Sequence, residues 1–131
     1  MQQIGHITLL VNDYDEAIEF FCGKLKFRLV EDKKMSDAKR WVLIAPPGST
    51  GTSVLLTKAT TDEQLNLVGK QAGGKVVMFL FTDNLSEDYA NLLSQRVKII
   101  EDPEVKPHGR VLIFADLYGN HYDLIEPTLN N

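Results

Sequence analysis

The feature that most constrains this chain is a sequence pattern that occurs twice, with the second copy about 70 residues after the first. The segment 27–32 (FRLVED) resembles 97–102 (VKIIED), and 40–45 (RWVLIA) resembles 110–115 (RVLIFA). An internal repeat of this length predicts two similar supersecondary units that complete one another's core.

Each copy carries the signals of a strand, a helix and three further strands. Strands are predicted where apolar runs end at polar, Gly or Pro residues, at 4–11, 27–31, 40–45 and 53–57, and again at 75–81, 97–100, 110–115 and 121–126. A helix is predicted after the first strand of each copy, because capping residues at 12–15 and 82–84 precede apolar side chains at helical spacing. Pro103 and Pro107 are expected to break the chain between the second and third strands of the second copy.

Length and charge restrict the class of protein. The 131 residues suit a single domain, with a first module at about 1–58, a connector at about 59–74 and a second module at about 75–128. The net charge of −4 argues against a nucleic-acid partner. Cys22 is the only cysteine, which excludes a disulfide within the chain. Neither a signal peptide nor a membrane span is expected, so a cytoplasmic location is predicted.

The residues that begin and end the repeat resemble those of the vicinal oxygen chelate superfamily, which includes glyoxalases, bleomycin resistance proteins and extradiol dioxygenases. The segments 4–11 (IGHITLLV) and 13–21 (DYDEAIEFF) resemble its first module. The turn 116–120 (DLYGN) and the strand 122–126 (YDLIE) resemble its closing strand, which follows an Asp-x-x-Gly-Asn/His turn. The resemblance covers nearly the whole chain. It implies an α+β fold in which two βαβββ modules form a curled mixed-sheet half-barrel around a pocket, and it implies a homodimer.

The resemblance also implies four positions at which metal-using members place ligands, on the first and fourth strands of each module. Here they fall at His6, Leu55, Val77 and Asp123. Leucine and valine have no donor atom, so only His6 and Asp123 are candidate metal ligands. We therefore expect no tightly held metal cofactor. A weakly bound divalent metal at His6 and Asp123, completed by His121, remains the alternative.

Strand alternation predicts which other side chains share a face with these positions. If those faces line the pocket, it is mostly apolar with a few polar groups, as is typical of a site for a small organic molecule. His6 and Asp123 are then candidate catalytic residues, a general base and its orienting carboxylate. The predicted substrate-binding residues are Arg40, Trp41, Leu55, Val77, Phe79, Arg110, Phe114 and His121. Arg40 and Arg110 suit an anionic group, with a surface ion pair as the alternative.

Two functions fit these observations. The first is a protein that binds a small, partly aromatic organic molecule in a mostly apolar pocket, without a tightly held metal. The second is a metal-dependent lyase, isomerase or dioxygenase that uses His6 and Asp123. A structural module with a filled interior and no ligand is a third possibility.

Overall fold

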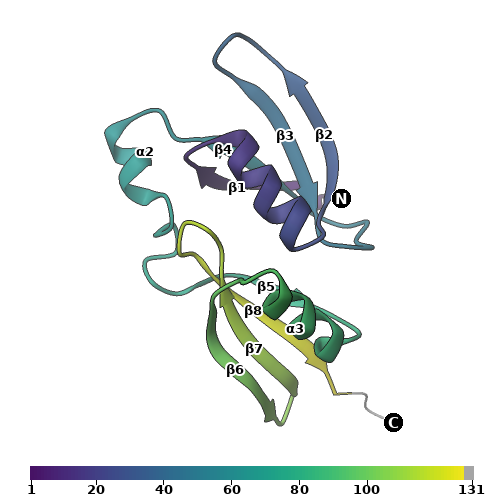
Figure 1. The fold of residues 1–131 in the computed structure, drawn as a ribbon. Coiled ribbons are helices and arrows are strands. Elements are labelled where there is room, and N and C mark those ends of the chain that lie inside the picture. The colour runs from purple at the N-terminus through teal and green to yellow at the C-terminus, as the bar shows by residue number, and fades with distance from the viewer. Residues whose placement is uncertain (129–131) are drawn as a thin grey trace. The chain divides into compact units, whose positions relative to one another are not determined.

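The computed structural model describes residues 1–128 and divides the chain into two compact units, residues 1–71 and residues 72 onward (Figure 1). The boundary falls inside the predicted connector. Each unit contains one four-stranded sheet and its own helices, and the order of elements in both is strand, helix and three strands. The predicted α+β fold of two βαβββ modules is therefore confirmed.

Unit 1 contains a mixed sheet with the strand order β1-β4-β3-β2, in which β1 is parallel to β4 and the other neighbours are antiparallel. A helix follows β1 and ends in a π-helical turn, and a short helix follows β4 in the predicted connector. The elements are β1 His6–Val11, α1 Tyr14–Ile18, η1 Glu19–Lys24, β2 Arg28–Lys34, β3 Arg40–Ala45, β4 Ser53–Lys58 and α2 Asp62–Leu67.

Unit 2 repeats this topology with the strand order β5-β8-β7-β6, again with one parallel pair, β5 and β8. Its elements are β5 Val76–Phe81, α3 Leu85–Ser94, β6 Ile99–Lys106, β7 Gly109–Ala115 and β8 His121–Pro127. Strand β6 is longer than predicted and runs through Pro103. The break expected at this proline is wrong, because β6 is an edge strand whose pairing is irregular between Glu101 and Glu104. Proline is tolerated at edges and irregularities, where its missing N–H removes no ladder bond.

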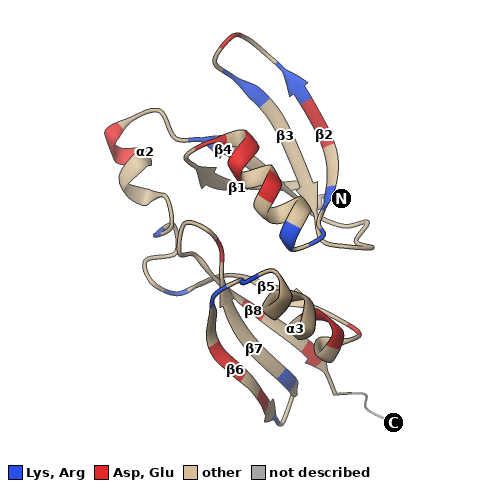
Figure 2. Ribbon diagram, viewed as in Figure 1, with Lys and Arg blue, Asp and Glu red and all other residues tan. Residues whose placement is uncertain are grey.

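The helices begin where side chains satisfy free backbone N–H groups. Asp13, Thr61 and Asn84 accept hydrogen bonds from the first turns of α1, α2 and α3, as is typical of N-cap residues. Acidic residues gather in the same first turns (Figure 2), where the positive end of the helix dipole favours negative charge. None of the helices in residues 1–128 is long and apolar enough to cross a membrane.

In each unit one face of the sheet packs against the helix and forms the core. In unit 1 this face includes Leu9, Val11 and Ile44, which are fully buried. In unit 2, Leu112 and Tyr122 are fully buried together with Leu85 of α3. Because successive side chains of a strand point to opposite faces, the residues between these positions lie on the other face. We call this second surface of each sheet its helix-free face.

The turn between β7 and β8 is organised by one buried carboxylate. Asp116 Oδ1 accepts hydrogen bonds from the backbone N–H groups of Tyr118 (2.9 Å) and Asn120 (3.1 Å). Asp116 Oδ2 accepts from Asn120 Nδ2 (2.9 Å) and from the Tyr122 hydroxyl (2.7 Å). Burial, and then the charge and hydrogen bond of Asp116, raise the pKa of Tyr122. Gly119 has a φ of 100°, a conformation that favours glycine. The DLYGN motif is thus a structural turn that positions the start of β8.

Candidate functional site

The helix-free face of unit 1 carries an aromatic and polar cluster. His6 of β1 and Trp41 of β3 meet edge to face, with 6.0 Å between ring centroids and 77° between ring planes. Trp41 Nε1 donates to Glu31 Oε2 of β2 at 3.2 Å, and Lys33 lies 3.6 Å from Glu31 Oε1. Leu55 of β4 shares this face, paired with Thr8 and Leu43 of the neighbouring strands. The face therefore presents an indole, an imidazole and one ion pair.

A side chain from the connector lies along the outer edge of this face. β1 is an edge strand, so the backbone groups on its outer side have no strand partner. Gln71 Nε2 donates to the carbonyl oxygen of Thr8 (2.6 Å), and Gln71 Oε1 accepts from the N–H of Leu10 (2.9 Å). One primary amide thus pairs with β1 as a neighbouring strand would.

The helix-free face of unit 2 is more apolar, and its carboxylates include Asp123 of β8 and Glu101 of β6, which both pair in register with Ile113 of β7. Phe79 of β5 pairs in register with Asp123 of β8, and Phe81 pairs with Ile125. Phe79 and Phe81 are 62% and 73% exposed, which is unusual for large aromatic residues within a strand. His121 lies two residues before Asp123 and therefore on the same face.

Asp123 is half-buried and its environment disfavours the charged form. Its Oδ1 atom is buried and has no hydrogen-bond partner among the described residues. Burial raises the pKa of Asp123, and Glu101 raises it further, whereas His108 and Lys106 act in the opposite direction. A carboxylate in such surroundings is stabilised by any group that donates a hydrogen bond to it.

The observed strand register supports the predicted equivalence of the two modules. Thr8 pairs with Leu55 in unit 1, and Phe79, 71 residues after Thr8, pairs with Asp123 in unit 2. Leu55 thus corresponds to Asp123, and this ligand position of unit 1 carries only carbon atoms. Among residues 1–128, no three His, Cys, Asp or Glu side chains gather where they could hold a metal ion. The residues present do not fit a complete metal site of the family type.

The register differs from the prediction at Val77. A shift between Val76 and Met78 leaves Val77 without a register partner and pairs Val76 with His121. Val77, predicted to line the pocket with Phe79, therefore lies at a bulge, whereas Phe79 and Phe81 follow the regular alternation opposite Asp123 and Ile125. One extra residue at a bulge reverses the alternation, so each residue before the bulge points to the opposite face from the one that regular alternation predicts.

Three predicted substrate-binding residues lie on the helix-covered faces instead. Phe114 is 2% exposed and stacks on Tyr122 in the core of unit 2. Arg110 donates to Ser86 Oγ of α3 at 3.2 Å and lies 3.9 Å from Glu126. Arg40 pairs with Asp15 of α1 and Asp32 of β2, both at 2.8 Å. This placement separates all three from the helix-free faces, and both arginines form ion pairs, which was the alternative interpretation for them. Their role in substrate binding stays a prediction.

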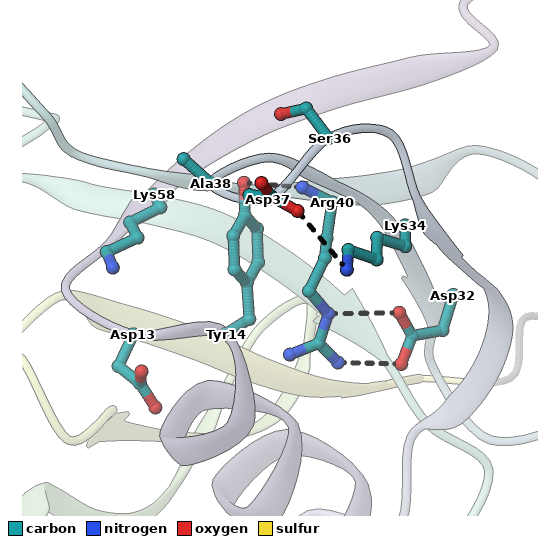
Figure 3. A pocket seen from close by; sticks show the side chains of 9 residues that line it. All are labelled: Asp13, Tyr14, Asp32, Lys34, Ser36, Asp37, Ala38, Arg40 and Lys58. Atoms are coloured by element: carbon teal, nitrogen blue, oxygen red, sulfur yellow. Dashed lines mark hydrogen bonds and ion pairs between the residues drawn. The ribbon is translucent and has the colours of Figure 1, made fainter.

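The Arg40 ion pairs border a surface pocket of unit 1 with a volume of about 500 Å³. Figure 3 shows the Arg40 guanidinium beside Asp32, with Lys34 and Asp37 paired next to it. The lining residues are Asp13, Tyr14, Asp32, Lys34, Ser36, Asp37, Ala38, Arg40 and Lys58. The acidic and basic side chains are equal in number and largely satisfy one another, and Arg40 also lies over the Tyr14 ring at 5.3 Å. This pocket lies between the start of α1 and the β2–β3 hairpin, and it has little apolar surface for an organic ligand.

Six of the predicted site residues fall into two groups on the helix-free faces. The structure brings His6, Trp41 and Leu55 together on one helix-free face, and Phe79, His121 and Asp123 together on the other. The catalytic pairing of His6 with Asp123 joins residues of different units and stays a prediction. Glu31 and Gln71 also contact the helix-free face of unit 1 or its edge, and the sequence did not predict them as site residues. A bulge between Leu29 and Glu31 places Glu31 beside Trp41, and Gln71 contacts β1 from 61 residues away, so neither has a local signal.

Comparisons with known proteins identify relatives along nearly the whole chain. The sequence profile of the Glyoxalase/Bleomycin resistance protein/Dioxygenase superfamily matches residues 3–124. An uncharacterized protein of Shewanella frigidimarina (strain NCIMB 400) is 48% identical over 126 residues, which cover 95% of this chain and 93% of that protein. The crystal structure of UcmS2 matches with a TM-score of 0.84 and 25% identity, over 96% of this chain and 98% of that chain. TnmS3, an antibiotic binding protein from Streptomyces sp. CB03234, matches with a TM-score of 0.78 and 26% identity, over 98% of both chains.

Proposed function

The chain belongs to the Glyoxalase/Bleomycin resistance protein/Dioxygenase superfamily, and we propose that it is a small-molecule-binding member of it. In this proposal a partly aromatic organic molecule binds to a helix-free sheet face without a tightly held metal. The observation that carries the proposal is the chemistry of these faces. They present Trp41, Phe79 and Phe81 as aromatic surface, and Leu55 stands where a metal-using member would place a ligand.

The similarity to TnmS3 supports the same function, because that protein is an antibiotic binding protein and the likeness extends over 98% of both chains. Exposed aromatic side chains are suited to such ligands, since they bury a large apolar area with few conformational states to lose. We further propose that the protein is a cytoplasmic homodimer.

Thermal denaturation with a panel of aromatic antibiotics tests the proposal. A ligand that binds the folded protein raises its melting temperature, and the rise grows with ligand concentration. Phe79→Ala should abolish the rise produced by a ligand that lies on β5. Leu93→Ala is the matched control, because Leu93 is also apolar and 51% exposed but lies on α3 of the same unit. Equal loss in both variants, or no stabilisation by any member of the panel, would contradict the proposal.

A metal-dependent lyase, isomerase or dioxygenase is the second candidate, and one observation favours it. The unpartnered oxygen of Asp123 is available to a cation, and His6 retains a ligand nitrogen at a family position. Elemental analysis of protein purified without a chelator separates the two candidates. Stoichiometric metal that is lost in both His6→Ala and Asp123→Asn would overturn the metal-free proposal, and 2-oxo compounds would then be tested as substrates.

A further inference from the structure

Asp123 has an acceptor atom that nothing in its own unit uses. Oδ1 is buried and accepts no hydrogen bond from the described residues. Buried polar groups in folded proteins nearly always have partners, and an exception calls for an explanation. Asp116, the buried aspartate of the β7–β8 turn, accepts four hydrogen bonds, so the unit does satisfy a carboxylate where its role is structural.

The surroundings of this acceptor are mostly carbon. Phe79 lies opposite Asp123 on β5, and Ile113 lies opposite it on β7. Ile125 follows on the same face of β8, beside Phe81. The Asp123 carboxylate is therefore a strong acceptor next to two exposed aromatic rings.

The neighbouring charges do not occupy the acceptor. His108 and Lys106 act on Asp123 through their charge, and neither donates a hydrogen bond to Oδ1. Glu101, paired in register with Ile113, is the other carboxylate close enough to act on Asp123. A ligand group that donates to Oδ1 would thus meet no competing donor from this unit.

We propose that Asp123 selects ligands by their hydrogen-bond donor, accepting an N–H or O–H group from a molecule whose aromatic ring lies against Phe79 and Phe81. The inference rests on the proposed binding function and specifies the ligand class, an aromatic compound with a donor one or two bonds from the ring. A protonated amine and a neutral hydroxyl share this chemistry. Either group can donate a hydrogen bond to Oδ1. This removes the free-energy cost of leaving the carboxylate without a partner when the aromatic ring of the ligand covers it.

Three small probes of similar size test the selection by NMR titration of the amide signals of β5 and β8. Benzylamine carries a charged donor, benzyl alcohol carries a neutral donor, and anisole carries no donor. We expect at least one donor probe to bind the wild type about tenfold or more tightly than anisole. Asp123→Leu, which removes both acceptor oxygens at similar volume, should eliminate that preference and leave anisole binding in place.

Two further variants keep the test decisive. Asp123→Asn retains one acceptor but no charge, so it should keep a preference for benzyl alcohol over anisole and weaken binding of benzylamine. Glu101→Gln removes the neighbouring carboxylate and is the matched control; it should retain the wild-type preference for benzyl alcohol, the neutral donor, over anisole. Equal affinity for all three probes, or a preference that survives in both Asp123 variants, would overturn the selection and leave the proposed function standing. If none of the probes shifts the β5 and β8 signals at millimolar concentration, and no antibiotic stabilises the protein, both proposals fail.

Discussion

Removal of the Asp116 carboxylate is expected to be among the most destabilising changes in unit 2. In Asp116→Ala, four donors lose their acceptor, and three of these belong to the buried residues Asn120 and Tyr122. Each buried donor without a partner costs about 1–3 kcal/mol, so the free energy of unfolding should fall by roughly 3–5 kcal/mol.

Urea unfolding followed by far-UV circular dichroism measures this loss. The comparison requires that the slope of the free energy of unfolding against urea concentration is the same in the variant and the wild type. The chain has a single tryptophan, Trp41, which lies in unit 1, so its fluorescence shows whether unit 1 is affected as well. Asp83→Ala is the control, because Asp83 is an exposed aspartate of the same unit. A loss below about 1 kcal/mol for Asp116→Ala would refute the reasoning, since it would mean that the buried donors find other acceptors.

A second substitution tests the mechanism of the loss. Tyr122→Phe in the wild type removes one hydrogen bond and should cost about 1 kcal/mol. In the Asp116→Ala background the Tyr122 hydroxyl has already lost the Asp116 acceptor, so the same change should cost less than it does in the wild type. Additive effects in this double-mutant cycle would show that the hydroxyl and the carboxylate do not interact.

Three other predictions concern stability. Burial raises the pKa of Asp123 above its ordinary value of 3.8, so ionisation of this carboxyl destabilises the folded state. Asp123→Asn should therefore raise the melting temperature at neutral pH. The gain should vanish below pH 3.8, where the carboxyl is protonated in both the folded and the unfolded state. Gln71→Ala should lower the free energy of unfolding by about 1–2 kcal/mol and speed amide exchange in β1, whereas an unchanged exchange rate would contradict the role of the side-chain amide. Gly109→Ala should cost more than about 2 kcal/mol, because its φ is 148° and a Cβ would lie 2.2 Å from the carbonyl oxygen of Glu126; Gly51→Ala, which meets open space, should change stability by under about 0.5 kcal/mol in the same urea assay.

Much of the fold follows from local patterns that the repeat makes visible twice. The apolar runs and their polar ends locate the strands, and β3 was predicted with its observed bounds, 40–45. Strand alternation divides the residues of each strand between two faces. It does not show which face the helix covers when both faces of a strand are apolar, as in RWVLIA. That choice depends on tertiary partners: Val42 and Ile44 are fully buried on the helix-covered face, where Arg40 also pairs with Asp15 of α1.

The site was less predictable because single inserted residues decide which side chains it contains. The bulge at Val77 moves Val76 into register with His121, and the bulge between Leu29 and Glu31 brings Glu31 to Trp41. Bulges of this kind leave no clear mark on a pattern of apolar and polar residues. Asp123 Oδ1 has no hydrogen-bond partner among the described residues, and its neighbours on the adjacent strands are Phe79 and Ile113. These neighbours come from distant parts of the chain, so the local sequence does not show that the oxygen lacks a partner.

The side chain of Gln71 has a consequence for how copies of this protein behave at high concentration. A strand at the edge of a sheet offers free N–H and C=O groups that strands of other molecules can join, and such edges promote aggregation. Gln71 occupies both the donor and the acceptor at the middle of β1, on its outer side. An incoming strand would have to displace this amide before it could pair there, so the connector protects unit 1 against uncontrolled growth of its sheet.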